Sequence, residues 1–137
     1  MGMLVTNNPL VKEQFQSELK VEFIETDLLG ILTYVRGMVH KGHMLMTHPL
    51  SGSIKPNESP YKSVLITGHM EDNAALFETD FNSKTDFQSV DIIEKSIQTA
   101  RKFPPKHIPD HYLTDLQTVD LDMIRSAMVK DVNPTCL

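Results

Sequence analysis

Two short segments of this sequence carry the side chains best suited to binding a small polar molecule. The first is TNNP, residues 6–9, which follows an apolar run, and the second is the polar stretch at residues 47–57, which lies between two apolar runs. Both segments share the frame Leu-x-Thr, then an amide or imidazole side chain, then Pro-Leu. The candidate ligand-binding residues are Thr6, Asn7, Asn8, Thr47, His48, Ser51, Gly52, Ser53, Lys55 and Asn57.

These residue types favour a small anion or a carboxylate as the ligand. Asn8 and Pro9 are typical of a helix start, where free N–H groups carry partial positive charge. The backbone of residues 51–53 can curl into a nest of N–H groups, and Lys55 adds a full positive charge. His48 can donate a hydrogen bond or move a proton near neutral pH. A purely structural role is the alternative, because the same residue types commonly form helix caps and turns.

Other site chemistries leave weaker signals. His107 and His111 have i,i+4 spacing, but Pro109 lies between them and no H-E-x-x-H frame is present. Cys136 is the only cysteine, so the chain has neither a pair for a disulfide nor a set for a cysteine zinc site. The G-x-S-x-G elbow and the Walker loop are also absent from the sequence. We therefore expect no metal and no bound cofactor.

The composition is that of one ordinary globular domain. The chain has 137 residues, of which 40% are hydrophobic and 23% charged, and its formal net charge is -5. A chain of this length can bury one core without a disulfide or a metal, so we expect a single domain over residues 1–137. The negative charge and the scattered Lys and Arg residues argue against nucleic acid as a partner, because its phosphates require a basic patch.

The N-terminal stretch MGMLVTNNP lacks the basic region and the long apolar region of a secretion signal. No segment approaches the roughly 18 consecutive apolar residues of a membrane span. The single cysteine gives no sign of an oxidising compartment. We therefore expect a cytoplasmic protein with no membrane partner.

Hydrophobic periodicity predicts alternating strands and helices. Strands are predicted at residues 3–6, 21–25, 43–48 and 61–67, with an edge strand at 75–77. Helices are predicted from Pro9 onward, at 28–39, at 89–103 and at 121–128, with a helical turn near 113–116. Asn8 and Asp27 are expected to cap the first two helices, and Gly42 is expected to end the second.

The order β-α-β-α-β over the first fifty residues is typical of a parallel sheet with crossover helices. We expect a single three-layer Rossmann-like or flavodoxin-like α/β domain, with a mostly parallel sheet of four to five strands and helices on both faces. In the flavodoxin-like order, strand 3–6 lies between strands 21–25 and 43–48, so the exits after Thr6 and Thr47 meet at the ligand-binding crevice. Strand 61–67 follows without a helix, which leaves its direction open.

The segments TNNPLV and LMTHPLSGSIKPNESPYKSVLI resemble the GrdX family, most specifically at residues 47–63. The family consists of small proteins encoded beside components of the glycine, sarcosine and betaine reductases of amino-acid-fermenting anaerobes. The resemblance supplies a cellular context, with no defined biochemical role and no catalytic residues. It implies reductase components as partners.

Two functions from different classes are consistent with these observations. The first is an accessory protein of glycine, sarcosine or betaine reductase systems whose polar cleft binds a small anion or carboxylate. The second is a small enzyme acting on a carboxylate or phosphate metabolite, with His48 as the proton carrier. A carboxylate in hydrogen-bond contact with His48 would favour the enzyme. The oligomeric state stays open, with a homo-oligomer as one option.

Overall fold

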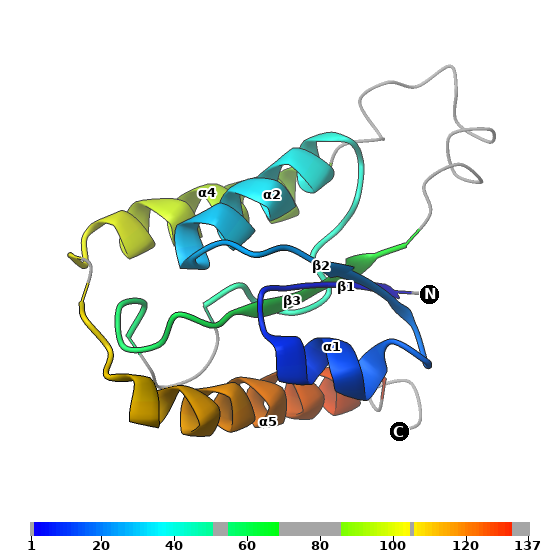
Figure 1. The fold of residues 1–137 in the computed structure, drawn as a ribbon. Helices are drawn as coiled ribbons and strands as arrows, with labels where there is room; N and C mark the ends of the chain where they lie inside the picture. Colours follow the sequence, from blue (N-terminus) through cyan, green and yellow to red (C-terminus); the bar gives the residue numbers. More distant parts are fainter. Residues whose placement is uncertain (1, 51–54, 69–85, 105, 133–137) are drawn as a thin grey trace, which may run out of the picture.

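A three-stranded sheet lies between helices on both of its faces (Figure 1). The computed structural model describes residues 2–50, 55–68, 86–104 and 106–132. In chain order the elements are β1 (Gly2–Thr6), α1 (Pro9–Phe15), β2 (Lys20–Phe23), α2 (Leu28–His40), β3 (Ser63–Thr67), α4 (Phe87–Arg101), the 3-10 turn η2 (Asp110–Tyr112) and α5 (Leu113–Val132). Helices α2 and α4 cover one face, and α1 and α5 cover the other (Figure 1).

The strand order is β2-β1-β3, so β1 is the central strand. It runs parallel to β2 and antiparallel to β3, and its residue Leu4 pairs with Val21 on one side and Leu65 on the other. The segment 44–47 runs along the other edge of β3, where the amide of Met46 donates to the carbonyl of Leu65 at 2.8 Å. β3 therefore separates β1 from this segment.

The predicted Rossmann-like fold is wrong, because the sheet is small and mixed rather than mostly parallel with four to five strands. Of the predicted strand at 43–48, only an isolated bridge between Leu45 and Ile66 is formed. The segment 61–67 takes the place beside β1 instead. Among the described residues, no crossover helix connects segment 43–48 to segment 61–67, and parallel neighbours need such a crossover. Segment 61–67 is therefore antiparallel to the segment before it. The predicted edge strand at 75–77 lies outside the described residues.

Local signals located the first two helices correctly. The side chain of Asn8 accepts a hydrogen bond from the amide of Leu10 at 3.0 Å and caps α1. Asp27 caps α2 through the amide of Gly30 at 2.8 Å. Gly42, just after α2, has a φ of 114°, a left-handed conformation that favours glycine. Both caps and the glycine stop were predicted from residue types alone.

Helix α5 is one continuous helix, although the sequence pattern predicted a turn near 113–116 and a separate helix at 121–128. Asp120, expected near the start of the second piece, instead lies inside the helix with a buried side chain, 2% exposed. None of the helices in the described ranges has both the length and the apolar character needed to cross a membrane.

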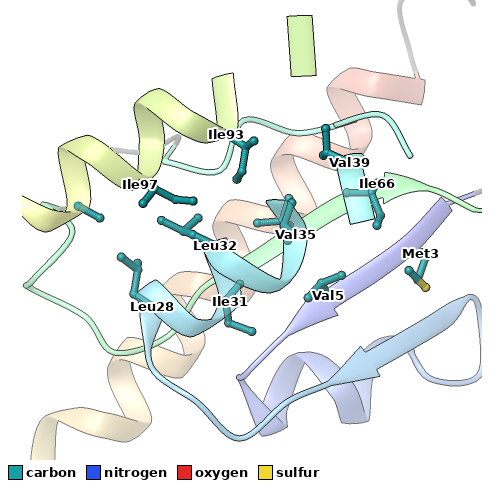
Figure 2. Packing of buried hydrophobic residues seen from close by; sticks show 12 residues of the cluster. Met3, Val5, Leu28, Ile31, Leu32, Val35, Val39, Ile66, Ile93 and Ile97 are labelled. Carbon is teal, nitrogen blue, oxygen red and sulfur yellow. The ribbon is translucent and has the colours of Figure 1, made fainter. Parts of the chain in front are cut away.

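Two hydrophobic cores form, one on each face of the sheet. The core between the sheet and helices α2 and α4 contains Val5, Val35 and Ile97 (Figure 2). The core between the sheet and helices α1 and α5 contains Leu4 and Ile124. Consecutive side chains of a strand point to opposite faces, so Leu4 and Val5 serve different cores. The central strand is therefore buried on both sides.

Candidate functional site

Asn7, the first residue after β1, ties three segments together at the carboxyl end of that strand. Its side-chain nitrogen donates to the carbonyls of Thr26 at 2.7 Å and Pro60 at 2.8 Å. Its side-chain oxygen accepts from the amide of Lys62 at 2.8 Å. These contacts join the loop after β2 and the chain entering β3 to the exit of β1. The amide of Asn7 is thus committed to positioning the loops that surround the site.

A chain of hydrogen bonds continues from β1 through β3 into α5. Ser63 Oγ donates to Asp120 Oδ2 at 2.8 Å, so the 2.7 Å contact between Thr6 Oγ1 and Ser63 Oγ uses the proton of Thr6. The backbone amide of Asn8 then donates to Thr6 Oγ1 at 3.0 Å, and Asn8 Nδ2 donates to Asp120 Oδ2 at 3.0 Å. The Asp120 carboxylate therefore accepts two hydrogen bonds in a buried position. It fixes α5 to the end of the sheet.

Lys62 is the second buried ionisable residue at this end of the sheet, and only 9% of it is exposed. Burial lowers the pKa of its ammonium group, and the nearby charge of Asp120 opposes that change in part. Among the described residues, no carboxylate lies within 4.0 Å of the ammonium nitrogen. A buried lysine without a close counter-ion is costly for folding, which is why such residues are candidates for function.

Lys62 is one of the residues that line a small hollow of about 20 Å³. Lys55 and Tyr61 also line it, together with the apolar side chains of Leu28 and Met123. The hydroxyl oxygen of Tyr61 accepts a hydrogen bond from the side chain of Gln117 in α5 at 3.0 Å. The hollow is large enough for a water molecule or a ligand of very few atoms.

A larger pocket of about 300 Å³ lies next to this hollow and shares three of its lining residues, Leu28, Pro56 and Ser59. Its walls come from the start of α2, the loop 56–60 and the end of α4. The side chain of Asn57 donates to the carbonyl of Pro104 at 2.9 Å and thereby joins the loop to the segment that follows α4. This contact sets the separation of two pocket walls.

The charged residues at the larger pocket are mainly basic. Arg101 and Lys106 line it, and Asp27 is the acidic residue among its lining. The Asp27 carboxylate is engaged in capping α2, and Lys106 Nζ lies 4.0 Å from Glu58 Oε2. Within the described ranges, no carboxylate lies within 4.0 Å of the Arg101 guanidinium. The charged residues that line the pocket therefore favour an anionic ligand.

The structure brings the predicted site residues only partly together. Thr6 is the last residue of β1, whereas Thr47 lies beside Leu65 in the middle of β3. β3 separates the two threonines, and each hydroxyl contacts that strand. Thr47 Oγ1 accepts from the amide of Leu65 at 3.0 Å. Asn57 lines the larger pocket and Lys55 the small hollow. Residues 51–53, the predicted anion nest, lie outside the described residues.

His48 is exposed, and its Nδ1 accepts a hydrogen bond from the amide of Leu50 at 3.0 Å. No carboxylate of the described residues forms an ion pair with it. The imidazole is therefore held by the backbone of its own loop. In addition, the described residues contain no group of three or more His, Cys, Asp or Glu side chains placed to hold a metal ion.

Lys62 and Asp120 were not among the residues singled out from the sequence. Lys62 stands in YKSVLIT, where a charged residue directly precedes an apolar strand, and it was read as part of that strand alone. Asp120 lies on the helix face that carries Leu121 and Ile124, and it was interpreted as a helix start. A charged residue on an otherwise apolar face was the available signal in both cases.

One known protein family matches most of the chain by sequence. The sequence model of the family described as GrdX-like protein matches residues 3–129. The match begins in β1 and ends within α5, so it includes all of the residues that line both pockets. Among curated proteins and among solved structures, none matches the chain.

Proposed function

This chain belongs to the GrdX-like protein family, and we propose that it acts as an accessory protein of glycine, sarcosine or betaine reductase systems that binds a small carboxylate. The reductase context is what the resemblance at residues 47–63 implies. The observation that carries the binding function is the pocket of about 300 Å³ with Arg101 and Lys106 in its lining. We further propose a cytoplasmic location in an anaerobe, which the single cysteine and the reductase context support.

The size and lining of the pocket support a small organic ligand. Ligand pockets are typically a few hundred Å³ or more, with mostly apolar walls and a few polar groups that orient the ligand. Leu28, Phe103 and Ile108 supply apolar wall here, and Asn57 and Arg101 supply polar groups. A guanidinium can hold a carboxylate through two parallel hydrogen bonds, so Arg101 is the residue that we assign to the carboxylate.

Asp27 adds a negative charge to the residues that line the pocket. Asp27 is among the lining residues together with Arg101 and Lys106, and its cap of α2 uses Oδ1, so the residues of the pocket carry charges of both signs. A ligand with a carboxylate and a positive nitrogen would be matched at both ends. Amino-acid carboxylates and their N-methylated forms have this charge pattern, whereas phosphate and acetyl phosphate carry only the negative part.

The enzyme alternative, with His48 as proton carrier, receives less support. A catalytic histidine is commonly oriented by a carboxylate, and His48 instead accepts from the Leu50 amide. Its neighbours at residues 51–53, which would hold an oxyanion, lie outside the described residues. A His48→Ala variant that loses turnover on a substrate found in the screen below would restore this alternative.

A thermal-shift screen tests the binding function directly. The ligands are glycine, sarcosine, betaine, phosphate, acetyl phosphate and nucleotides, each added to the full chain. A ligand at 100 times its Kd stabilises the folded state by about 2.7 kcal/mol, which raises Tm by several degrees. We expect a response to at least one of the amino-acid carboxylates. If no carboxylate or other anion raises Tm at millimolar concentration, the binding function is wrong.

The variant Arg101→Gln tests the assignment within the pocket. Loss of a charge-assisted hydrogen bond costs about 1.5–3 kcal/mol, so the Kd of the active ligand should rise about tenfold or more. The matched control is Arg125→Gln, which removes the same charge from α5, where Arg125 contacts Gln14 and lines neither pocket. Calorimetric titration of both variants measures the two Kd values. An equal effect of both would indicate a general charge effect and contradict the assignment.

The accessory role needs a separate test, because a ligand could bind without any reductase. The tagged chain is incubated with extract of a glycine-fermenting cell, with and without the ligand found in the screen, and the captured proteins are identified by mass spectrometry. We expect reductase components among them. Their absence under both conditions would contradict the accessory role and leave the ligand site as the part that stands.

A further inference from the structure

The small hollow beside Lys62 is a second site, distinct in its chemistry from the carboxylate pocket. The buried residue Lys62 lines it together with Lys55 and Tyr61. Asn7 holds the backbone of Lys62 through two hydrogen bonds. The backbone N–H of Lys62 donates to Asn7 Oδ1, and the backbone N–H of Asn7 donates to the carbonyl of Lys62 at 3.4 Å. The lysine therefore enters the hollow from a fixed backbone position.

We propose that the amine of Lys62 reacts reversibly with the carbonyl group of a small aldehyde acid or 2-oxo acid to form an imine. The hollow is about 20 Å³, which admits a carbonyl group and few further atoms. Lys55 lines the same hollow and supplies a positive charge for the carboxylate of such a compound. This inference rests on the Lys62 hollow and not on the proposed carboxylate pocket.

The reaction is balanced without an oxidant or a reductant. The neutral amine attacks the carbonyl carbon and forms a C–N bond, and a proton passes from nitrogen to the former carbonyl oxygen. The resulting carbinolamine loses that oxygen as water, and the C=N bond forms. Addition of water reverses both steps and releases the carbonyl compound. The chain therefore captures and releases the compound unchanged.

The surroundings of Lys62 favour the neutral amine that this reaction requires. Burial lowers the pKa of the ammonium, the carboxylate of Asp120 in α5 acts in the opposite direction, and Lys55 is the other charged group lining the hollow. Nucleophilic lysines are commonly activated by burial or by a neighbouring cation. A lysine held in this way is unprotonated in a larger fraction at neutral pH than a lysine in solvent.

Tyr61 can assist the loss of water. Its oxygen accepts from Gln117 Nε2, which leaves the proton of the phenol for another acceptor. Tyr61 is among the residues that line the same hollow, and a phenol there can donate a proton to the departing oxygen of the carbinolamine. We assign it this proton-donating role. Its loss should slow imine formation without removing the amine.

Reductive trapping tests the proposal on the full chain. The protein is incubated with glyoxylate and cyanoborohydride at neutral pH, which converts an imine into a carboxymethyl-lysine that peptide mass spectrometry locates. We expect Lys62 to be modified several-fold faster than Lys95, an exposed lysine of α4, because burial lowers the pKa of the Lys62 ammonium. The product should be absent from Lys62→Arg. Modification of Lys62 at or below the rate of Lys95 would overturn the proposal.

Formaldehyde and two further variants test the assigned roles. Formaldehyde has the carbonyl group without the carboxylate, so Lys55→Gln should slow the trapping of glyoxylate at Lys62 several-fold more than that of formaldehyde. An equal effect on both would overturn the carboxylate part. Tyr61→Phe should slow the trapping of both glyoxylate and formaldehyde at Lys62 several-fold. Unchanged trapping rates would show that Tyr61 takes no part in the reaction. Arg125→Gln, at a residue that lines neither pocket, should leave trapping unchanged. Trapping is read at Lys62 itself, so this test and the ligand screen can fail independently.

Discussion

The two asparagines at the end of β1, Asn7 and Asn8, have different structural roles. Asn8 caps α1 and also contacts Asp120, whereas Asn7 joins two loops to the sheet. Both were predicted to contact a ligand, and that role stays a prediction. Their side-chain amides are hydrogen-bonded within the fold, so they position the segments around the site. Lys62, which is hydrogen-bonded to Asn7 through its backbone, has no carboxylate within 4.0 Å of its ammonium among the residues that the structure describes.

The pH dependence of stability should report the burial of Lys62. Its pKa in the folded chain lies below the ordinary value of 10.5, so the unfolded chain binds more protons between the two values. The resulting loss of stability is complete below the folded-state pKa, decreases as the pH rises through it, and is gone above 10.5. The free energy of unfolding of Lys62→Met should therefore exceed that of the native chain most at neutral pH, and the difference should decrease progressively toward pH 10.5.

Urea unfolding of both chains across this pH range measures the difference. Lys95→Met is the matched control, because Lys95 is 72% exposed and its loss should give a nearly constant difference over the same range. Burial and the Glu22 carboxylate raise the pKa of Tyr34, but Tyr34 is present in every chain and cancels in the comparison. Parallel curves for Lys62→Met and the native chain would contradict the lowered pKa.

At the scale of elements, the start of α2 depends on a close approach between the helix and the loop before it. A Cβ added at Gly30 would lie 1.8 Å from Thr26 Oγ1 and 2.8 Å from Thr26 Cβ. At Gly37, in the same helix, a Cβ would meet nothing within 4 Å. Thr26 also accepts a hydrogen bond from Asn7, so displacing it would disturb the exit of β1.

The two glycines should therefore respond oppositely to alanine. Gly30→Ala should lower the free energy of unfolding by about 1–3 kcal/mol, because the loop must move to admit the methyl group. Gly37→Ala should raise it by about 0.5–1 kcal/mol through better helix propensity. Thermal unfolding of both variants gives the comparison. Stabilisation by Gly30→Ala would mean that Thr26 does not pack against the helix.

The sequence predicted those elements whose signals are local. The caps at Asn8 and Asp27 and the stop at Gly42 depend on neighbours within a few residues, and they are as predicted. The partner of a strand depends on residues far along the chain, and no local pattern distinguishes segment 43–48 from segment 61–67 as the neighbour of β1. The predicted parallel order failed at this step.

The ligand site expected from the sequence at the carboxyl end of β1 stays a prediction. Of the residues named for it, Asn57 and Lys55 line the two pockets, whereas Asn7 and Asn8 line neither. Asp120 and Arg101 reach this end from helices that follow much later in the chain. Their arrival depends on how α4 and α5 pack on opposite faces of the sheet, which periodicity does not specify.

At the scale of the whole molecule, β1 connects the two halves of the structure. Its alternating side chains enter both cores, and both of its edges are hydrogen-bonded, to β2 and to β3. The chain of contacts from Thr6 through Ser63 to Asp120 links the same strand to α5. Opening either face therefore disturbs β1, whereas β2 is paired on one edge only within the described sheet.

Native-state hydrogen exchange should follow this arrangement. The amides of β1 at Leu4 and Val5 should exchange the slowest, close to the rate set by global unfolding, because no smaller opening exposes them. Those of β2 (Lys20–Phe23) should exchange faster, since that strand lies at an edge and its residues are only partly buried or exposed. Exchange read by NMR under native conditions gives both rates. Slower exchange in β2 than in β1 would mean that β1 is not the central strand of the most stable part of the fold.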